Sequence, residues 1–321
     1  MTVLVLTRDR LDATADLVVA ELTGRGFPVV RIDPGDFPES SGLAVRIGPG
    51  RDGWEGSWRG QHRDLNLNEV SAVYYRRPSP FRLHPGLSAD DARWAGAEAR
   101  AGLGGILASL PCAWINHPHR NAVADCAPVA LATAARSGLT VPPSLITNDP
   151  DEARDFVASL PGGRAAYKPV GNSGPSMHEG RAHVLWTAPV TADRITPSVA
   201  VTAHLFQQWV DKAYEVRLTA VDHTVFAAEI HAGSDASRID FRRDYDALTY
   251  AECEAPEPIR RGVRSLMAAL APRYVAMDFL VDVDGRWYAV DVNPGGQYGF
   301  VPHLRDPVTR ALADALQGES R

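Results

Sequence analysis

The sequence lacks the long apolar segments that membrane insertion requires. It has no run of about 18 apolar residues, the length that a membrane-spanning helix needs. Its first ten residues, MTVLVLTRDR, predict a short strand, because a secretory signal would place basic residues before a longer apolar core. We therefore expect a cytoplasmic protein with no membrane partner.

Cysteine is scarce, and positive charge is not in excess. Cys112, Cys126 and Cys253 show no C-x-x-C spacing, so they indicate neither a disulfide framework nor a zinc site, and we expect them to be packing residues. The net charge of −6 argues against an obligate nucleic-acid partner. It is still compatible with a local basic groove for nucleotide phosphates or an acidic peptide.

Common catalytic signatures are missing as well. No G-x-G-x-x-G turn follows the first predicted strand, so the usual dinucleotide fingerprint is absent. The pattern G-x-x-x-x-G-K-[ST] is also absent, which excludes a P-loop of the Walker type. There is no Ser-His-Asp arrangement and no nucleophile elbow, and His117, His119 and His231 lack a metal-ligand spacing.

The chain does have an ordinary globular composition, with 321 residues of which 45% are hydrophobic and 22% are charged. Residues 1–117 predict a βαβ opening, followed by a strand pair within 54–67, a strand at 70–75, a helix near 88–110 and a strand at 114–116. A second block predicts a helix at 123–136, a strand at 144–147, a helix capped near 148–149 and a strand at 165–169. The remainder predicts strands between 199 and 230, a helix at 258–270, a hairpin at 278–294 and a terminal helix from Pro307. The order indicates an α+β, multi-lobed arrangement.

The hairpin is the most informative segment. Asp284-Gly285 is a two-residue turn signal between alternating apolar residues. If this dipeptide is the turn, Phe279 pairs with Val290 and Asp278 pairs with Asp291.

Two acids opposite each other on a ladder repel, and Asn293 shares a face with Asp291. A divalent cation between the acids would remove the repulsion, and carboxylate and amide oxygens suit Mg²⁺ that also binds nucleotide phosphates. The alternative is a solvated hairpin edge with incidental acids, and these residues alone favour neither.

Lys168 ends a predicted strand and precedes a small-residue loop, residues 169–174. An ammonium beside several backbone N–H groups suits a polyphosphate, although a lysine before a turn is more often a solvated charge. Gln208, Trp209 and Val210 form a connection between two strands, which could offer backbone groups and an apolar wall to adenine.

Three further candidate sites include an arginine. Glu215 and Arg217 share a strand face. Glu215 suits a ribose or a metal, and Arg217 suits a phosphate or a carboxylate, but on these residues alone we prefer an ordinary ion pair between them. Arg242 follows a Gly/Ser loop and could bind an acyl phosphate or a substrate carboxylate through two hydrogen bonds. The alternative is an exposed arginine with no ligand. Arg76-Arg77 predicts a solvated cluster at a strand end.

Taken in order, the strand-end lysine, Q-Q-W-V, E-V-R, D-F-R and D-V-N-P-G-G-Q resemble the ATP-grasp fold. More closely, the chain resembles the ATP-grasp ribosomal peptide maturases, which are the graspetide (microviridin-type, omega-ester peptide) synthetases, of the actinobacterial type. The resemblance covers essentially the whole chain and includes V-L-V-L-T-R, Y-Y-R-R-P-S-P-F at 74–81, N-H-P-H-R at 116–120 and G-L-T-V-P-P-S-L-I-T-N-D-P at 138–150.

The resemblance implies an α/β fold with a pre-ATP-grasp domain at 1–117, a central ATP-grasp subdomain at 118–205 and a C-terminal subdomain with the metal hairpin at 206–321. It implies a cytoplasmic ligase that uses ATP and Mg²⁺ to phosphorylate Asp or Glu side chains of a ribosomal precursor peptide, leader plus core. Ser, Thr or Lys side chains then displace the phosphate to form ester or amide macrocycles. A homodimer is a further expectation, and no nucleic acid is expected.

The implied site residues all lie at the nucleotide or its metal: Lys168 for the phosphates; Gln208, Trp209 and Val210 for adenine; Glu215 for the ribose side; Arg217 and Arg242 as catalytic cations; and Asp278, Asp291 and Asn293 for Mg²⁺.

Two positions depart from the family pattern. Ala127 stands where the family usually has a lysine that contacts the nucleotide phosphates, and Asp291 replaces a usual Glu. These departures keep two other functions open. One is a degenerate ATP-grasp protein that binds nucleotide or leader peptide without catalysis, and the other is an ATP-grasp amino-acid or peptide ligase.

Overall fold

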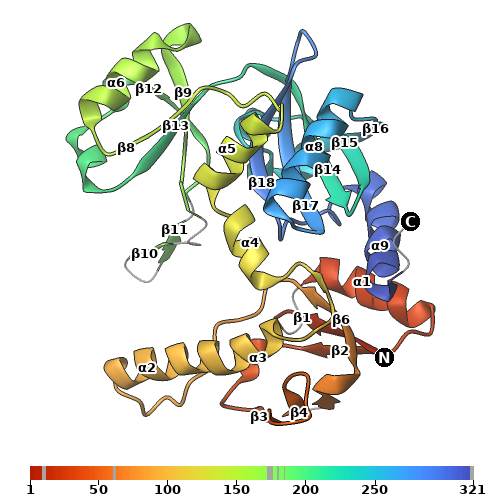
Figure 1. Cartoon of the computed structure of the whole chain (residues 1–321). Helices are drawn as coiled ribbons and strands as arrows, with labels where there is room; N and C mark the ends of the chain where they lie inside the picture. The colour runs from red at the N-terminus through yellow and green to blue at the C-terminus, as the bar shows by residue number, and fades with distance from the viewer. Residues whose placement is uncertain (9–11, 61–62, 172–175, 179–180, 184, 319–321) are drawn as a thin grey trace.

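The computed structural model describes residues 1–8, 12–60, 63–171, 176–178, 181–183 and 185–318 (Figure 1). The mixed α/β architecture predicted from the sequence is confirmed. No helix in these described ranges is long and apolar enough to cross a membrane.

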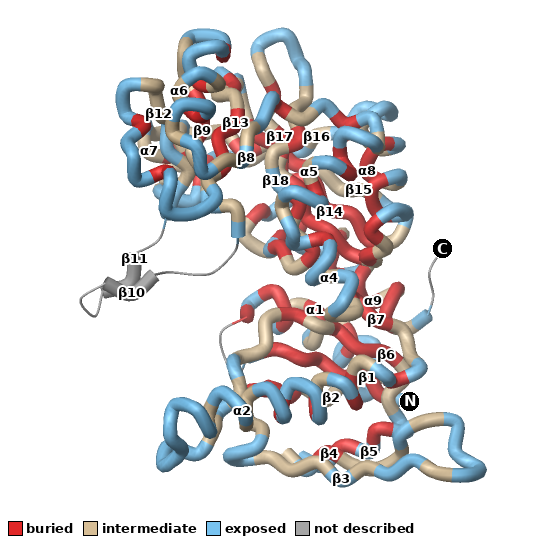
Figure 2. Tube along the Cα trace, turned by 60° about the vertical axis from the view of Figure 1, so that its left-hand side comes forward, coloured by how far each residue is buried: buried red, intermediate tan, exposed pale blue. Residues whose placement is uncertain are grey.

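The N-terminal domain is built on a parallel sheet with the order β2-β1-β6-β7. Its strands are β1 (Thr2–Leu6), β2 (Val29–Ile32), β6 (Val70–Tyr75) and β7 (Ala113–Ile115). Val3 and Val5 of β1 belong to one core cluster, and Leu4 and Leu6 belong to another, so both faces of the strand are buried. This two-sided burial explains the uninterrupted apolar run in the sequence. Figure 2 shows buried residues along β1 and β6.

Helices cover both faces of this sheet. One face packs against α1 (Ala13–Gly24) and α9 (Pro302–Gln317). The other packs against a π-helical turn (Arg100–Gly104) and α3 (Gly105–Ala108), which continue from α2 (Ala89–Ala99). A small sheet of β3 (Gly42–Arg46), β4 (Glu55–Arg59) and β5 (Asp64–Asn66) covers the second face further. Helix α9 therefore joins the end of the chain to its first domain.

The predicted helix over 123–136 ends at Arg136 as expected, but its predicted start is wrong, because two helices occupy this region: α4 (Pro118–Ala124) and α5 (Ala127–Arg136). A continuous helix would drive the ring of Pro128 into the carbonyl of Ala124, four residues earlier. The chain breaks at Asp125-Cys126 instead, and Pro128 lies in the first turn of α5, where its missing N–H costs nothing. The start of the predicted terminal helix is also wrong, since α9 begins at Pro302 and contains Pro307.

Two larger antiparallel sheets follow the N-terminal domain in the described part of the chain. The central sheet has the order β12-β9-β13-β8, and its core includes side chains of α6 (Pro150–Ser159). Its strands are β8 (Ser144–Thr147), β9 (Arg164–Lys168), β12 (Ala188–Thr191) and β13 (His204–Gln208), and a separate hairpin pairs β10 (Ser176–His178) with β11 (Arg181–His183). The C-terminal sheet has the order β16-β15-β14-β17-β18 and lies between α8 (Glu257–Leu270) and α9. Its strands are β14 (Lys212–Val221), β15 (Thr224–Ala232), β16 (Leu248–Cys253), β17 (Tyr274–Asp282) and β18 (Trp287–Asn293), and α7 (Asp235–Ile239) lies between β15 and β16 in the chain.

The acidic hairpin joins β17 to β18. The predicted two-residue turn is wrong: the loop spans Val283–Gly285, with the Asp282 N–H donating to the Arg286 carbonyl at 3.1 Å and Gly285 at φ +76°. Phe279 accordingly pairs with Ala289 and not with Val290.

A bulge between Phe279 and Asp278 then leaves Val290 as the extra residue and restores the predicted register beyond it. Asp278 therefore faces Asp291, as the sequence predicts, and Asn293 faces Ala276.

The contact between α8 and the end of α5 allows a stability test. An ideal Cβ at Gly262 would lie 2.4 Å from Leu139 Cδ2 and 3.2 Å from the Ser137 carbonyl oxygen, and Leu139 is buried. Alanine gains about 1 kcal/mol of helix propensity over glycine, but overpacking costs about 1–3 kcal/mol. We expect Gly262→Ala to lower the midpoint of thermal unfolding measured by circular dichroism.

The matched control is Gly96→Ala in α2, where the nearest atom, Leu83 Cδ1, is 3.6 Å from the added Cβ. Propensity alone acts there, so this variant should unfold at the same or a higher temperature. A Gly262→Ala protein as stable as the control would contradict the packing argument.

Candidate active site

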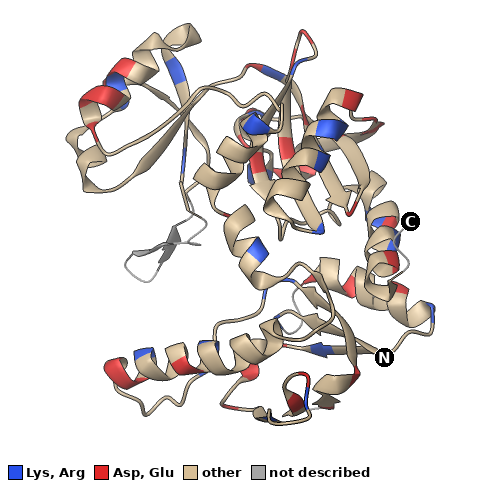
Figure 3. Ribbon diagram, viewed as in Figure 1, with Lys and Arg blue, Asp and Glu red and all other residues tan. Residues whose placement is uncertain are grey.

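One cleft of about 430 Å³ lies between the central and C-terminal sheets, and all ten residues predicted for the site line it. They come from β9, from the end of β13 and its connection to β14, from β14 itself, from the segment after α7, and from the strands of the acidic hairpin. They are Lys168, Gln208, Trp209, Val210, Glu215, Arg217, Arg242, Asp278, Asp291 and Asn293. Figure 3 shows that both signs of charge meet in this part of the molecule.

The two acids of the hairpin lie beside an arginine of β14. Arg217 is the ladder partner of Asp278, and its Nη1 atom lies 3.1 Å from Asp278 Oδ1. The geometry is not that of a hydrogen bond, so Asp278 Oδ1 and Arg217 Nε are both buried without a hydrogen-bond partner in the described part of the chain. Burial raises the pKa of Asp278, the nearby Asp291 raises it further, and Arg217 opposes both effects.

A hard divalent cation fits this arrangement. Asp278 offers a buried oxygen without a hydrogen bond, Asp291 lies opposite it, and Asn293 adds an amide oxygen one position along the same face. Within the described residues, no group of three or more His, Cys, Asp or Glu side chains could hold a metal. The set is therefore two carboxylates and an amide, which suits Mg²⁺ that completes its shell with phosphates and water.

Lys168 lies in the cleft and is not a solvated surface charge. Its Nζ donates to Gln207 Oε1 at 2.8 Å and to the Val290 carbonyl at 3.4 Å. Burial lowers the pKa of Lys168, while Asp291 and Asp278 oppose the shift. This ammonium is thus close to the metal-binding acids. Of the following loop, residues 172–174 lie outside the described residues.

The connection between β13 and β14 uses part of its backbone internally. The N–H of Gln208 donates to the Pro143 carbonyl at 2.7 Å, and that of Trp209 donates to the Arg164 carbonyl at 3.3 Å. The buried Val210 is the third residue of the connection, and its N–H has no backbone acceptor among the described residues. Val210 is therefore an N–H donor that this connection can offer to a base edge.

Glu215 and Arg217 do not pair with each other. Glu215 is buried and binds Lys212, whose Nζ lies 2.6 Å from Glu215 Oε1, while Arg217 lies beside Asp278. Burial raises the pKa of Glu215, and Lys212 opposes the shift. The preference for an ordinary Glu215–Arg217 pair is wrong, because each side chain has an opposite charge on another position of the sheet.

Arg242 is held by a carboxylate that the sequence prediction did not single out. Asp240 Oδ1 accepts from Arg242 Nε at 2.8 Å, and Asp240 Oδ2 accepts from Arg242 Nη2 at 2.5 Å. The D-F-R spacing was the available signal, since it places a carboxylate two residues before the guanidinium. Arg242 is 48% exposed on its side chain and lies over the Trp186 ring, so its outer edge can meet an anion in the cleft.

The arginine pair of the N-terminal domain also differs from expectation. Arg76 is buried and Arg77 lines the cleft, so the predicted solvated cluster is wrong. Asp125 and Ala127 line the same cleft, and Ala127 is the first residue of α5. The start of α5 therefore faces the cleft without a cationic side chain at position 127.

Asp240 provides a pH-dependent test of the cleft. Burial raises its pKa, but the hydrogen bonds and charge of Arg242 lower it by more, so that the net pKa lies below 3.8. The folded protein then binds fewer protons than the unfolded chain, and the carboxylate adds stability that is lost as the pH falls from 3.8 through the folded pKa. We expect Asp240→Asn to lower the unfolding midpoint near neutral pH by the equivalent of about 1–3 kcal/mol.

The difference from wild type should narrow below pH 3.8. Asp246→Asn, at an exposed acid of the same segment, is the control and should change little at either pH. A difference that stays constant with pH would contradict the assigned ion pair.

Comparisons with known proteins bear on the fold that carries this cleft. Residues 2–122 match the family model of the MvdD pre-ATP grasp domain. None of the curated protein sequences that were compared with the chain matches it.

Solved structures resemble the chain over its whole length. A RiPP-associated ATP-grasp ligase of Chryseobacterium gregarium, in complex with ADP and a leader and core peptide, has a TM-score of 0.90 at 23% identity, over 100% of this chain and 97% of that chain. The macrocyclase MdnC of Microcystis aeruginosa MRC, bound with precursor peptide MdnA, has a TM-score of 0.85 at 25% identity, over 99% and 100%. The macrocyclase MdnB of the same organism has a TM-score of 0.80 at 22% identity, over 98% of each chain.

The resemblance inferred from the sequence motifs is thus confirmed. The chain carries an MvdD pre-ATP grasp domain at its amino terminus and has, over its full length, the ATP-grasp fold of the RiPP-associated ligases.

Proposed function

We propose that this protein is an ATP- and Mg²⁺-dependent ligase that forms side-chain ester or amide macrocycles in a ribosomal precursor peptide. The observation that carries the proposal is the convergence of all ten implied site residues on one cleft. The likeness to a ligase in complex with ADP and to a macrocyclase bound with its precursor peptide supports it. An enzyme that consumes ATP and acts on a newly made peptide would work in the cytoplasm.

Each wall of the cleft has a role in this proposal. Lys168 neutralises nucleotide phosphates, and Gln208, Trp209 and Val210 receive adenine, with the Val210 N–H as donor to its edge. Glu215 lies on the ribose side, where it is paired with Lys212. Asp278, Asp291 and Asn293 hold the cation, which would supply charge neutralisation at the phosphates.

The reaction itself requires little covalent chemistry from the protein. An Asp or Glu carboxylate of the peptide attacks the terminal phosphorus of ATP, and the bond to ADP breaks, which gives an acyl phosphate. A Ser or Thr hydroxyl or a Lys amine then attacks the acyl carbon, phosphate leaves, and the nucleophile loses its proton. Arg217 and Arg242 suit the negative charge that the two steps present, since positioning and charge neutralisation dominate phosphoryl transfer.

The direct test incubates the protein with ATP, Mg²⁺ and the precursor peptide encoded beside its gene. We expect mass spectrometry to show the loss of one water for each bond formed, together with ADP release. Addition of hydroxylamine should trap the acyl phosphate as a hydroxamate. Tight ATP binding with an intact peptide would overturn the macrocyclase assignment, and a mass gain would indicate an amino-acid or peptide ligase.

Ala127 favours a second candidate, a protein that binds nucleotide or leader peptide without catalysis. The residue lines the cleft without a charge, and a missing charge-assisted hydrogen bond weakens binding or the transition state by about 1.5–3 kcal/mol, or roughly one to two decades. We expect Ala127→Lys to raise turnover by that factor in single-turnover assays. Ala127→Met is the control for side-chain length.

An equal effect of both substitutions would show that charge at position 127 is irrelevant. Wild-type turnover that already matches Ala127→Lys would remove the support for the second candidate.

The expected homodimer stays a prediction, and sedimentation velocity would test it by measuring the mass of the protein in solution.

A further inference from the structure

The loop after the acidic hairpin, residues 294–296, follows the metal-ligand candidate Asn293 directly, and we call it the exit loop. Asn293 Oδ1 accepts from the Gly295 N–H at 3.0 Å, and the Asn293 carbonyl accepts from the Gly296 N–H at 3.1 Å. An amide oxygen has two lone pairs, so one remains for a cation. The position of the exit loop therefore sets the direction of the Asn293 side chain.

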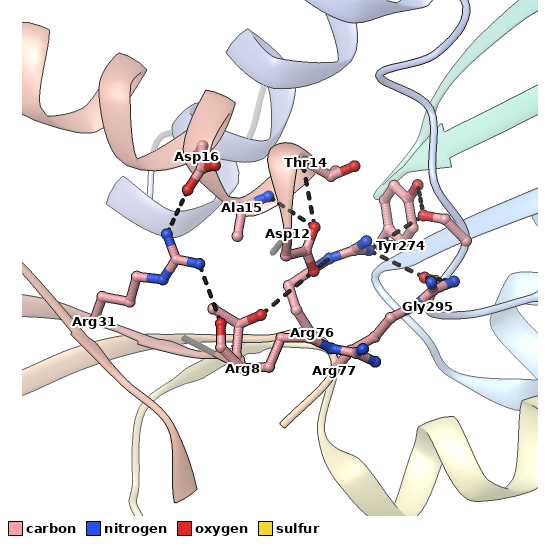
Figure 4. A network of polar contacts seen from close by, with 12 residues as sticks. Arg8, Asp12, Thr14, Ala15, Asp16, Arg31, Arg76, Arg77, Tyr274 and Gly295 are labelled. Atoms are coloured by element: carbon pink, nitrogen blue, oxygen red, sulfur yellow. Dashed lines mark hydrogen bonds and ion pairs between the residues drawn. The ribbon is translucent and has the colours of Figure 1, made fainter. Parts of the chain in front are cut away.

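Arg76 of the N-terminal domain binds this loop across the domain boundary. Its Nη1 donates to the carbonyls of Gly295 and Gly296, each at 3.2 Å, and its Nε donates to Asp12 Oδ2 at 3.3 Å (Figure 4). The Arg76 side chain is 1% exposed. Asp12 also caps α1 by accepting from the N–H groups of Thr14 and Ala15, so the carboxylate is fixed and so is the guanidinium.

Asn116 makes a second connection from the same domain. Its Nδ2 donates to the Pro294 carbonyl at 3.0 Å and to the Tyr274 carbonyl at 2.7 Å. Its Oδ1 accepts from the N–H groups of Arg273 and Tyr274, both at 2.8 Å. This one amide thus ties the end of the parallel sheet to the start of β17 and to the exit loop.

The exit loop also has little freedom on its other side. An ideal Cβ at Gly296 would lie 2.4 Å from the Cβ of Ala276, which is the ladder partner of Asn293. The Gly296 carbonyl accepts from the Tyr274 hydroxyl at 2.7 Å as well. Packing and hydrogen bonds together leave one position for the loop.

We infer that Arg76 and Asn116 are positioning residues of the N-terminal domain, which hold the exit loop so that Asn293 faces the cation. The inference rests on the proposed function, because it takes Asn293 as a metal ligand. The N-terminal domain then helps to position a metal ligand of the catalytic centre.

The test measures Mn²⁺ binding in the presence of ADP by electron paramagnetic resonance, for the full chain and its variants. Arg76→Lys keeps a positive charge beside Asp12, but one ammonium cannot replace the fork that reaches a carboxylate and two carbonyls. We expect Mn²⁺ affinity to fall about 10- to 100-fold, as for other partners that orient metal ligands. The spectrum of bound Mn²⁺ should also change, because one ligand is displaced.

Gly296→Ala is the second variant, since it moves the exit loop without removing a buried charge. It should weaken Mn²⁺ binding to a similar extent. Arg25→Ala is the control, because Arg25 joins α1 to Asp314 and Gln317 of α9 at 2.6 and 2.7 Å, a contact between the same parts of the molecule that does not involve the exit loop. It should lower the unfolding temperature but leave Mn²⁺ affinity within about twofold of wild type.

The outcomes separate the inference from the function on which it rests. Wild type that binds Mn²⁺ with ADP, while Arg76→Lys and Gly296→Ala bind equally well, would overturn the positioning role alone. A loss of affinity in Arg25→Ala as large as in Arg76→Lys would also overturn it, because general destabilisation would then explain both. Wild type that binds no Mn²⁺ with ADP would overturn the proposed function, and the inference with it.

Discussion

The architecture of the cleft depends on one electrostatic constraint, the position of the largely buried Asp278 opposite the exposed Asp291 on adjacent strands. Two carboxylates in this position repel, and burial adds the cost of removing charge from water. The structure compensates with two cations, Arg217 on the neighbouring strand β14 and Lys168 on β9 of the central sheet. Among the described residues, five acidic and five basic side chains line the cleft, so the positive charges there balance the acids that a metal would bind.

The ion pairs around this centre show which cations already bind a carboxylate of the protein. Lys212 is paired with Glu215 and Arg242 with Asp240, at hydrogen-bond distances. Lys168 has only neutral oxygen acceptors among the hydrogen bonds of the described residues. Its ammonium can therefore exchange these contacts for those of a phosphate without breaking an ion pair.

The candidate site was predicted from the resemblance to the ATP-grasp ligases, because residue type and spacing alone left each of its residues with an ordinary structural alternative. The sequence pattern predicted the Asp278–Asp291 pair although the predicted turn was wrong, since the longer loop shifts the register by one position and the bulge at Val290 reverses the shift. A bulge depends on tertiary packing, so turn chemistry alone could not reveal it. The break between α4 and α5 could have been predicted from the sequence, because Pro128 excludes a helix that runs through it.

Long-range partners were beyond the sequence argument. Arg76 meets the carbonyls of Gly295 and Gly296, more than 200 residues later, and nothing in the local pattern distinguishes this buried guanidinium from the solvated pair that Arg76-Arg77 suggests. Asn116 is similar, because a polar residue after a short strand usually faces water. Only the docking of the two domains buries both residues and gives them these acceptors.

Calorimetric titration with Mg·ATP, for wild type and for an Asp291→Ala, Asn293→Ala double variant, tests the central claim most directly. The account predicts tight binding by wild type that is lost in the double variant while the unfolding temperature is retained, because a metal between the hairpin acids carries the nucleotide phosphates. Equal binding by the two proteins would contradict the metal site, and no binding by wild type at millimolar ATP would contradict the nucleotide-dependent function itself.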